Sequence, residues 1–465
     1  MTDPARAAAR QTRVIERLGR LVACPSVGAD PAAAQGMEDA RRLIEGWLAE
    51  SGWQGIRRLH GGGAPAIFAE RMDAPGRPTL IVYAHYDVQP ADPVAAWTTP
   101  PFVATRRDGR IHGRGTSDDK GPLLIALEAM AALVAAEGRL PVNVKLLIEG
   151  EEETGSPSLP RILRENAAAL AADAVLSADG ARWRPDLVSV NVGARGTAGL
   201  ELTLRTAGRD LHSGRYGGMV PNALHLMARL IASLHDGDGR IAVPGFLDGV
   251  AEPSPEERAA IAAIPFDAAA FLAPTGAMPW GEAGHAPLER LWLRPTIEVN
   301  GMWGGHLGAG AKTVIPHEAH AKITIRLVPG QDPAACLAAL KAHLVAACPP
   351  CARLHFGAEK GQAPAWSLAP DHPLLAAAEA ALEEVHGTRP LRVRIGASLP
   401  VTALMRDILG IDTVMLSYAT ADENIHAPDE FLRESAIGEG IAAWIATLRR
   451  VGGQDGADYA AFRGR

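Results

Sequence analysis

Four acidic residues stand within five positions at Glu149-Gly150-Glu151-Glu152-Glu153, directly after an apolar run. Carboxylates gathered this closely repel one another, so a fold that brings them together gains from a divalent cation bound among them. Because neighbouring glutamates can point in different directions, one of Glu152 and Glu153 could bind a cation while the other moves protons. The competing interpretation is a solvated acidic loop without a chemical role.

Residues of the same chemical kind follow three predicted strands and precede one predicted helix: His85, Asp87, Asp118, Asp179 and His426. Two histidines and several carboxylates, with no thiolate among them, suit two zinc, manganese or cobalt ions. A carboxylate such as Asp118 could bridge two ions, and Asp87 could hold the His85 ring through a hydrogen bond. A water between two such ions ionises near neutral pH and can attack an amide.

These residues are positioned by an alternating pattern of strands and helices. Short apolar runs predict buried strands at 66–70, 78–84, 142–148, 174–178, 391–395 and 414–418. Apolar residues at three- and four-residue steps predict helices at 12–23, 38–51, 123–137, 159–170, 373–385, 400–408 and from about 432. Ligands bind at the carboxyl ends of strands in open α/β sheets, so this pattern predicts one site at one sheet edge.

The pattern changes after Gly193. Strands at 197–205, 296–299, 319–328 and 353–356, with helices at 221–235 and 333–347, follow the order β-α-β-β-α-β of the ferredoxin-like plan. The long segment 239–294 is expected to form its own helices. We therefore predict a domain of residues 1–193 and 366–465, an inserted domain of residues 194–365, and a mobile tail at 452–465.

Composition excludes several classes of protein. The net charge of −7, with no basic run, argues against a nucleic-acid partner. No stretch of eighteen consecutive apolar residues occurs, so no membrane span is expected. Four cysteines are too few for a disulfide framework, and we interpret them, including the closely spaced Cys348 and Cys351, as reduced thiols of a cytoplasmic protein.

Six stretches identify a resemblance to a known family: His85 to Pro90, Gly113 to Pro122, Glu149 to Ser156, Leu211 to Gly214, Gly310 to Pro316, and His426. In this order they resemble the di-zinc metallopeptidase family that includes cytosolic nonspecific dipeptidase, carnosinase, aminoacylase and glutamate carboxypeptidase. The length of segment 239–294 and the sequences around His212 and Thr313 favour the dipeptidase and carnosinase branch. The family implies an α/β fold, in which a zinc-exopeptidase-like catalytic domain with a mostly parallel sheet is interrupted by a ferredoxin-like lid and dimerisation domain.

The resemblance also implies a role for each matched residue. Of two metal ions, expected to be zinc, His85, Asp118 and Asp179 would hold one, and Glu153 and His426 would hold the other, with Asp118 bridging. Glu152 would be the general base, and Asp87 would orient His85. In a homodimer formed through residues 194–365, His212 would enter the partner subunit's site and stabilise the oxyanion, while Arg326, Thr313 and Ser398 would bind the substrate's free carboxylate.

The implied activity is hydrolysis of dipeptides or short peptides with a free C-terminus by metal-bound hydroxide. The alternative is deacylation of N-acetyl or N-succinyl amino acids, which needs the same metals and base. A third hypothesis, a metal-free binding or scaffold homologue, predicts loss of a ligand or of the base, and none is lost. The run Glu423-Asn424-Ile425 departs from the acidic-glycine run common in the dipeptidase branch, which leaves the substrate preference open.

Overall fold

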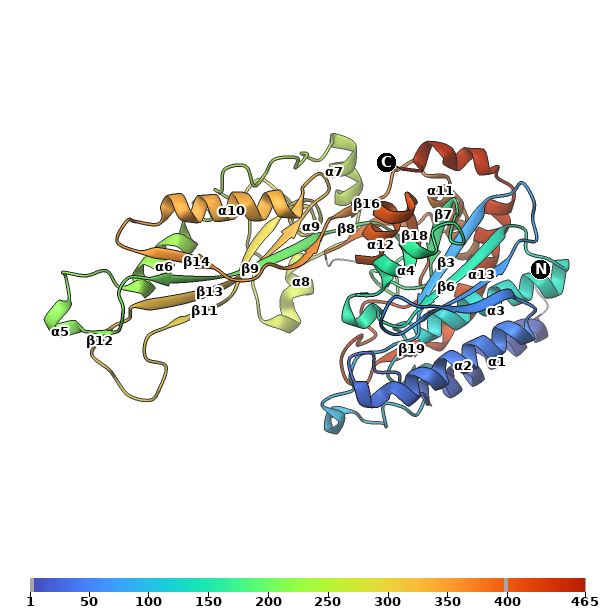
Figure 1. Ribbon diagram of the computed structural model, residues 1–465. Helices are drawn as coiled ribbons and strands as arrows, with labels where there is room; N and C mark the ends of the chain where they lie inside the picture. Colours follow the sequence, from blue (N-terminus) through green and yellow to red (C-terminus); the bar gives the residue numbers. More distant parts are fainter. Residues whose placement is uncertain (1–3, 397–399, 465) are drawn as a thin grey trace. The chain divides into compact units, whose positions relative to one another are not determined.

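The computed structural model describes residues 4–396 and 400–464 (Figure 1). Its backbone forms two compact units. The first contains the chain up to Val192, Leu368–Val393 and the chain from Pro400 onward, and the second contains Gly193–Ser367 with the described residues from Arg394 to Gly396.

The first unit is built on a sheet in which the strands follow the order β1-β2-β6-β3-β7-β18-β8. The four strands from β6 to β18 are parallel to one another, whereas β1, β2 and β8 pair antiparallel at the flanks. The strands are β1 (Gln54–Leu59), β2 (Ala66–Arg71), β3 (Thr79–His85), β6 (Asn143–Glu149), β7 (Ala174–Ser177), β8 (Ser189–Ala194) and β18 (Thr413–Met415). The predicted α/β class is confirmed, and the sheet is mixed, with a parallel centre between antiparallel flanks.

Helices cover both faces of this sheet, which explains the continuous apolar runs of its central strands. Helices α1 (Pro4–Val22), α3 (Lys120–Glu137), α11 (Pro373–His386) and α13 (Glu434–Gly452) pack against one another. Helices α4 (Leu159–Glu165) and α12 (Pro400–Leu404) share a separate apolar core with β2, β3 and β6. All seven residues of β6 are buried, and the ammonium group of its one lysine, Lys145, donates to the carbonyl of Ala171 at 2.7 Å.

The prediction that the C-terminal tail is mobile is wrong. Residues Gly456–Phe462 form the 3-10 helix η6, and its Tyr459 is completely buried. The Tyr459 hydroxyl donates to Gln454 Oε1 at 2.7 Å, and its ring lies edge-on to His372 at 5.8 Å between centroids. Phe462 also lies edge-on to His372, at 4.9 Å between centroids, so two aromatic residues anchor this segment to the unit.

The second unit contains an antiparallel sheet with the order β11-β13-β9-β14. Its strands are β9 (Gly196–Arg205), β11 (Thr296–Gly304), β13 (Glu318–Leu327) and β14 (Arg353–Phe356), and β15 (Lys360–Ala363) also pairs with β9. Helices α6 (Ala223–Ala232) and α10 (Pro333–Ala347) bury one sheet face with the alternate apolar residues of β9 and β13. This chain order and strand order are those of the ferredoxin-like plan.

The long segment between α6 and β11 has helices of its own, as its length indicated. They are α7 (Pro255–Ala262), α8 (Ala268–Leu272) and α9 (Pro287–Leu293). In Figure 1, α10 lies above the sheet of this unit and α8 lies below it. The segment therefore contributes to the sheet face that α6 and α10 leave open.

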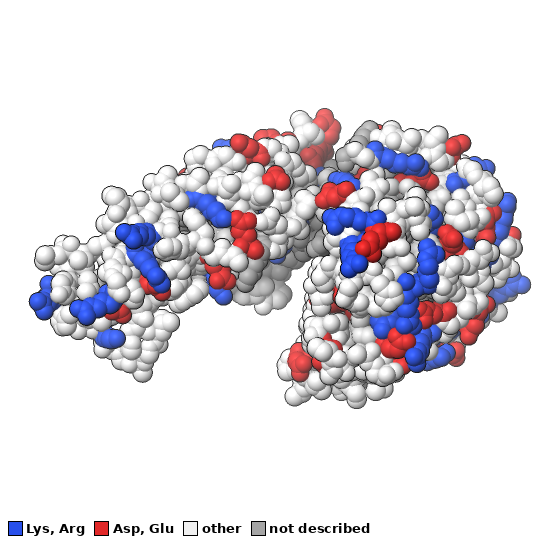
Figure 2. Space-filling view, viewed as in Figure 1, with Lys and Arg blue, Asp and Glu red and all other residues white. Residues whose placement is uncertain are grey.

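The surface carries charges of both signs. On the face drawn in Figure 2, lysine and arginine side chains alternate with aspartate and glutamate side chains. No helix within residues 4–396 and 400–464 is long and apolar enough to cross a membrane. The four cysteines are unpaired, and Cys24 and Cys336 are buried.

Candidate metal centre

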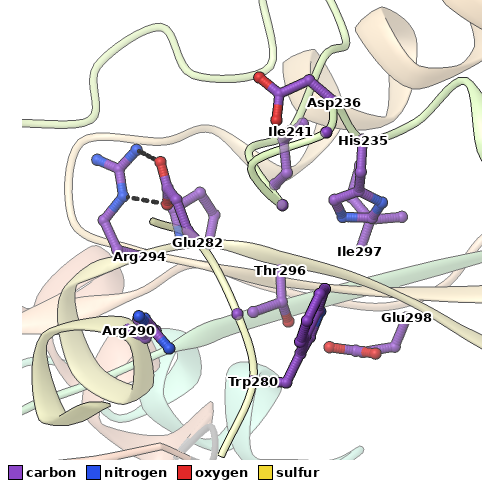
Figure 3. A pocket seen from close by; sticks show the side chains of 14 residues that line it. His235, Asp236, Ile241, Trp280, Glu282, Arg290, Arg294, Thr296, Ile297 and Glu298 are labelled. Atoms are coloured by element: carbon purple, nitrogen blue, oxygen red, sulfur yellow. Dashed lines mark hydrogen bonds and ion pairs between the residues drawn. The ribbon is translucent and has the colours of Figure 1, made fainter. Parts of the chain in front are cut away.

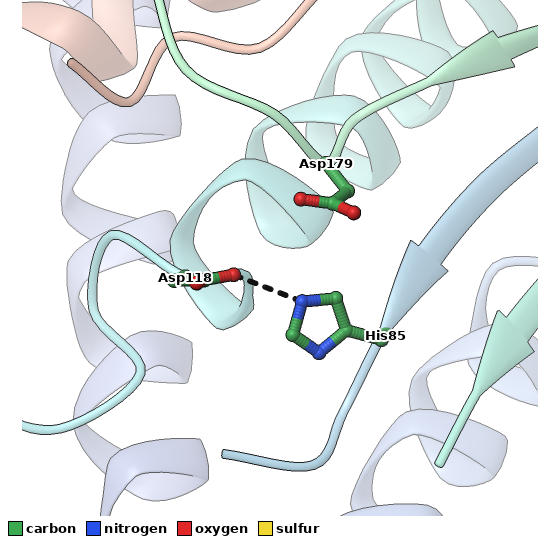
Figure 4. Close-up of side chains that lie close together, drawn as sticks. All are labelled: His85, Asp118 and Asp179. Atoms are coloured by element: carbon green, nitrogen blue, oxygen red, sulfur yellow. Dashed lines mark hydrogen bonds and ion pairs between the residues drawn. The ribbon is translucent and has the colours of Figure 1, made fainter. Parts of the chain in front are cut away.

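The five residues predicted as metal ligands form two overlapping groups in the first unit. One ligand atom from each of His85, Asp118 and Asp179 lies within 4.8 Å of the others, and the same holds for Asp118, Glu153 and His426. Figure 4 shows the carboxylates of Asp118 and Asp179 beside the His85 ring. Asp118 belongs to both groups, as a residue that bridges two ions must.

His85 is the last residue of β3 and is fully buried. Its Nε2 lies 2.9 Å from Asp118 Oδ1, and its Nδ1 lies 3.1 Å from the main-chain oxygen of Asp87. The Asp87 carboxylate is also within 3.4 Å of that Nδ1 and accepts hydrogen bonds from the main-chain nitrogens of Glu152 and Glu153. Asp87 thus fixes the ring of one candidate ligand and the turn that carries the two glutamates.

The two neighbouring glutamates are placed differently. They follow β6 in the 3-10 helix η3 (Glu152–Thr154), where Glu153 Oε2 lies 3.0 Å from His426 Nε2 and accepts a hydrogen bond from Gln89 Nε2. Glu152 belongs to neither group of candidate ligands found in the described chain. This arrangement leaves the Glu152 carboxylate available for proton transfer.

His426 is held in a left-handed backbone conformation, with a φ of 64°. Its Nε2 lies 3.0 Å from Asp118 Oδ2 and 3.0 Å from Glu153 Oε2. The side chain is half-exposed, with 52% of its surface accessible, whereas that of His85 is completely covered. One side of the centre is therefore open to a ligand from solution.

Two buried glutamates on either side of His426 fix the loop that carries Asp118. Glu430 accepts hydrogen bonds from the main-chain nitrogens of Gly115, Ser117 and Asp118. It also forms an ion pair with Arg114 at 2.7 Å, in which each side chain is only 1% exposed.

Glu423 makes the second link, because its Oε2 accepts a hydrogen bond of 2.6 Å from the Ser117 hydroxyl. The sequence interpretation missed Arg114, Glu423 and Glu430. The available signal was a pair of glutamates flanking the candidate histidine and an arginine in the glycine-rich run before Asp118.

The electrostatics of the site are those of crowded acidic groups. Burial raises the pKa of Asp179 to about 6 and, with the charge of Asp179, raises the pKa of Glu152 well above its usual range. Hydrogen bonds to Asp118 and Glu153 raise the pKa of His426 to about 10. Although burial opposes it, contact with His426 and His85 holds the pKa of Asp118 below its usual range. Without bound metal ions, this group of side chains therefore retains protons at neutral pH.

Metal ions fit these residues. Two imidazoles and three carboxylates form the nitrogen and oxygen donor set that zinc, manganese and cobalt accept. Ligand atoms that share one zinc ion lie roughly 3 to 3.5 Å apart, because each is about 2.0–2.2 Å from the ion. The 2.9 and 3.0 Å separations between the imidazole nitrogens and the Asp118 oxygens are close to that spacing. A cation would also replace the protons that the crowded carboxylates hold.

Two of the predicted residues lie together in the second unit, away from Arg326. His212 belongs to β10 (Leu211–His212), which pairs with β12 (Val314–Ile315), and the main-chain nitrogen of Ser213 donates to the carbonyl of Thr313. His212 is exposed, and its Nδ1 accepts a hydrogen bond from the main-chain nitrogen of Gly214 at 3.1 Å. The ring proton is therefore on Nε2, which can donate to an oxygen.

Arg326 belongs to the ferredoxin-like sheet and lies near the end of β13 that is farther from β12. There it pairs with Thr296 of β11 and Thr197 of β9. Glu318, at the end of β13 nearest β12, is eight residues away along the strand, which corresponds to roughly 25 Å. The structure thus groups Thr313 with His212 and separates both from Arg326. Ser398, the third residue predicted to bind the carboxylate, lies outside the described residues.

Comparison with known proteins identifies relatives along most of the chain. A model of peptidase family M20/M25/M40 matches residues 81–450. Human Beta-Ala-His dipeptidase is 30% identical over 388 residues, which cover 82% of this chain and 76% of the human protein. The Cys-Gly metallodipeptidase DUG1 of Saccharomyces cerevisiae is 29% identical and covers 93% of this chain and 94% of its own length.

Among solved structures, the M20 family metallo-carboxypeptidase Sso-CP2 of Sulfolobus solfataricus superposes with a TM-score of 0.80 at 30% sequence identity. The match covers 96% of this chain and 99% of that one. Both the sequence and the fold are therefore similar over nearly the full length.

Proposed function

The chain belongs to peptidase family M20/M25/M40, and on this basis we propose that it is a metal-dependent dipeptidase. The reaction is hydrolysis of the amide bond in dipeptides or short peptides that have a free C-terminal carboxylate. Relatives named as dipeptidases for β-Ala-His and for Cys-Gly support this substrate class.

The observation that carries the proposal is the pair of ligand groups that share Asp118, with Glu152 beside them but in neither group. His85 and Asp179 would complete the binding of one divalent ion, and Glu153 and His426 that of a second. We propose zinc, with manganese and cobalt as alternatives. Bound there, the ions would polarise the amide carbonyl and lower the pKa of the attacking water.

Glu152 is the proposed general base. Its carboxylate would accept a proton from the attacking water and deliver it to the nitrogen of the leaving amine. Asp87 supports this role, because its carboxylate accepts the hydrogen bond from the Glu152 main-chain nitrogen and also lies 3.4 Å from Nδ1 of the His85 ring. The base and one metal ligand are thus held by the same carboxylate.

His212 is the proposed donor to the carbonyl oxygen as it becomes negative. The hydrogen bond from Gly214 to Nδ1 leaves Nε2–H exposed and able to donate to that oxygen. Arg326 is the proposed partner of the substrate's terminal carboxylate, because a guanidinium can form two parallel hydrogen bonds with a carboxylate. Ser398 is proposed to assist it on the strength of the family resemblance.

The separation of these residues supports a shared site in a homodimer. A fully extended dipeptide spans only about 7 Å, far less than the roughly 25 Å of strand that separates Arg326 from the end of the sheet near His212. One dipeptide therefore cannot contact Arg326, His212 and Thr313 of the same chain. We propose that the inserted domain, residues 194–365, forms the dimer and that His212 and Thr313 act on the substrate bound by the other subunit.

The location proposed for the enzyme is the cytoplasm. All four cysteines are free thiols, and two of them are buried where oxidants have little access. Free thiols of this kind are usual in reducing compartments.

Initial rates on a small substrate panel test the proposed activity. The full-length protein is purified, loaded with zinc or manganese, and assayed with free dipeptides, the same dipeptides with C-terminal amides, and N-acetyl and N-succinyl amino acids. A dipeptidase that binds the terminal carboxylate cleaves the free dipeptides and rejects the amides. Cleavage of the acylated amino acids alone would replace this proposal with the deacylase alternative.

A further inference from the structure

A cavity of about 380 Å³ lies on the open face of the ferredoxin-like sheet. The even-numbered residues of β13 point away from the core made with α6 and α10, and Arg326 is the last of them. Thr296 and Glu298 of β11 line the cavity beside Arg326, and so does Arg195, which directly precedes β9. The floor of the cavity is therefore polar and is built from the strands.

The walls of the cavity are apolar and come from the segment between α6 and β11. Phe266, Phe271, Leu272, Trp280 and Leu291 line it. The Phe266 and Phe271 rings are 5.3 Å apart between centroids, yet Phe271 is 55% exposed and Trp280 is 88% exposed. Covering exposed aromatic surface with an apolar group removes both from water, which is favourable, so these walls favour an apolar group on the ligand.

The polar residues that line the cavity carry more positive than negative charge. Three arginines, Arg195, Arg290 and Arg326, line the cavity with one carboxylate, that of Glu298. Burial and the neighbouring Arg326 lower the pKa of Arg195 to about 10, which means that its charge is poorly compensated. Arg290 Nε is buried and has no hydrogen-bond partner among the described residues. An anionic group on the ligand would compensate this charge.

A second cavity of about 460 Å³ adjoins the first, and an ion pair in its lining holds the chain next to Trp280 (Figure 3). Trp280 and Arg290 line both cavities, and two residues after Trp280 the Glu282 carboxylate binds the nearly buried Arg294 through bonds of 2.7 and 2.8 Å. The ion pair anchors the chain beside the exposed ring. The charge of Arg294 is therefore already compensated by a carboxylate.

We propose that the first cavity binds the C-terminal residue of the substrate, with the carboxylate at Arg195 and Arg326 and a large apolar or aromatic side chain against Phe271 and Trp280. This assignment rests on the proposed dipeptidase activity, in which Arg326 contacts the terminal carboxylate. It gives the segment between α6 and β11 a role in substrate selection. Peptides that end in phenylalanine or leucine are the preferred class.

The test compares kcat/KM for Ala-Phe, Ala-Leu, Ala-Asp and Ala-Gly with the metal-loaded, full-length protein. The wild-type protein is expected to favour Ala-Phe over Ala-Gly by tenfold or more. Phe271→Ala and Trp280→Ala are each expected to lower this ratio at least fivefold. Val345→Ala, which truncates a similarly exposed apolar residue on α10, leaves the ratio unchanged.

Three outcomes overturn the assignment. An equal or lower kcat/KM for Ala-Phe than for Ala-Gly shows that the apolar walls do not select the substrate. Ala-Asp as the best substrate shows that the arginines bind an acidic side chain instead. A wild-type preference for Ala-Phe that neither Phe271→Ala nor Trp280→Ala reduces places the selection elsewhere.

A binding measurement separates this assignment from the proposed activity. Calorimetric titration of the Glu152→Gln protein with Ala-Phe, its C-terminal amide and Ala-Gly requires no turnover. Tighter binding of Ala-Phe than of the other two, lost in the Glu152→Gln/Phe271→Ala double variant, supports the cavity even if no dipeptide is hydrolysed. Hydrolysis of dipeptides with equal binding of all three ligands sustains the activity and rejects the cavity.

Discussion

Arg114 and Glu430 form an ion pair of 2.7 Å in which each side chain is only 1% exposed. The two residues are 316 positions apart, and the same Glu430 carboxylate accepts hydrogen bonds from the main chain of the loop that ends in Asp118. This pair therefore connects the loop of Asp118, the candidate ligand shared by both groups, to the loop of His426.

Removal of one partner leaves a buried charge without compensation. Arg114→Met is expected to lower the free energy of unfolding by about 3–5 kcal/mol, as measured by urea denaturation. The matched control is Arg161→Gln, which breaks the exposed helical pair of Arg161 with Glu165 and is expected to change stability by less than about 0.5 kcal/mol. Equal effects of the two substitutions would contradict the importance of the buried pair.

Substitutions of the two adjacent glutamates should have different effects, one on catalysis and the other on metal binding. Glu152→Gln is expected to lower kcat by at least about a hundredfold while the metal content stays at the wild-type level, because only the proton acceptor is lost. Glu153→Gln is expected to lower the metal content, since Glu153 lies in a ligand group. Elemental analysis after gel filtration, combined with initial rates, distinguishes the two. Full activity of Glu152→Gln would reject it as the base.

Substitution of Asp118 and substitution of Asp179 should differ in the number of bound metal ions that are lost. Asp118 belongs to both ligand groups and Asp179 to one. Asp118→Asn is therefore expected to reduce the content of both metals, whereas Asp179→Asn leaves about one ion for each chain. The measurement is the metal-to-protein ratio after dialysis. A ratio of one in Asp118→Asn would show that this carboxylate is not shared.

Complementation tests the shared site of the proposed dimer. His212→Ala and Glu152→Gln are each expected to be nearly inactive. After subunit exchange at equal concentrations, half of the dimers contain one chain of each kind, and one of their two sites has both residues intact, so about a quarter of the wild-type sites return. Mass spectrometry of intact dimers verifies the exchange. Exchange without any recovery of activity would place His212 and Glu152 in the same subunit's site.

The stability of metal-free protein should depend on pH through His426. Contact with Asp118 and Glu153 raises its pKa from 6.5 to about 10, so the folded state holds the proton more tightly than the unfolded state. This contribution is fully present below pH 6.5 and is lost as the pH rises from 6.5 to 10. Thermal melts of chelated protein are expected to show a decline across that range that His426→Gln lacks. His225→Gln, at an exposed helical position, should retain the decline.

The main elements and the candidate ligands were predictable because each produces a local signal. The apolar run before Glu149 indicated the buried strand β6. His85 and Asp179 were expected directly after strands, and in the structure His85 is the last residue of β3 and Asp179 comes two residues after β7. The order of elements in the second unit likewise indicated its plan. Such signals depend only on neighbours in the chain and on the periodicity of regular structure.

The supporting residues were not predictable for the opposite reason. Glu423 and Glu430 resemble solvated loop residues in the sequence, and only contacts with residues more than 300 positions away make them buried anchors. Tyr459 similarly fixes a tail whose composition suggested mobility. The placement of Thr313 beside His212, and not beside Arg326, follows from strand pairing between distant segments. Long-range pairing leaves little trace in local composition.

The long segment of the second unit, Gly193–Ser367, begins and ends at neighbouring points of one antiparallel ladder. Strand β16 (Trp366–Ser367) pairs with the end of β8, with Trp366 opposite Ala194 and Ser367 opposite Gly193. Residues about 5 Å apart across such a ladder can be joined by a two-residue turn. The intervening chain could therefore be gained, lost or exchanged during evolution without rethreading the parallel sheet. A hydrolase with a shorter substrate-recognition module, or with none, is accessible from this topology by a single deletion.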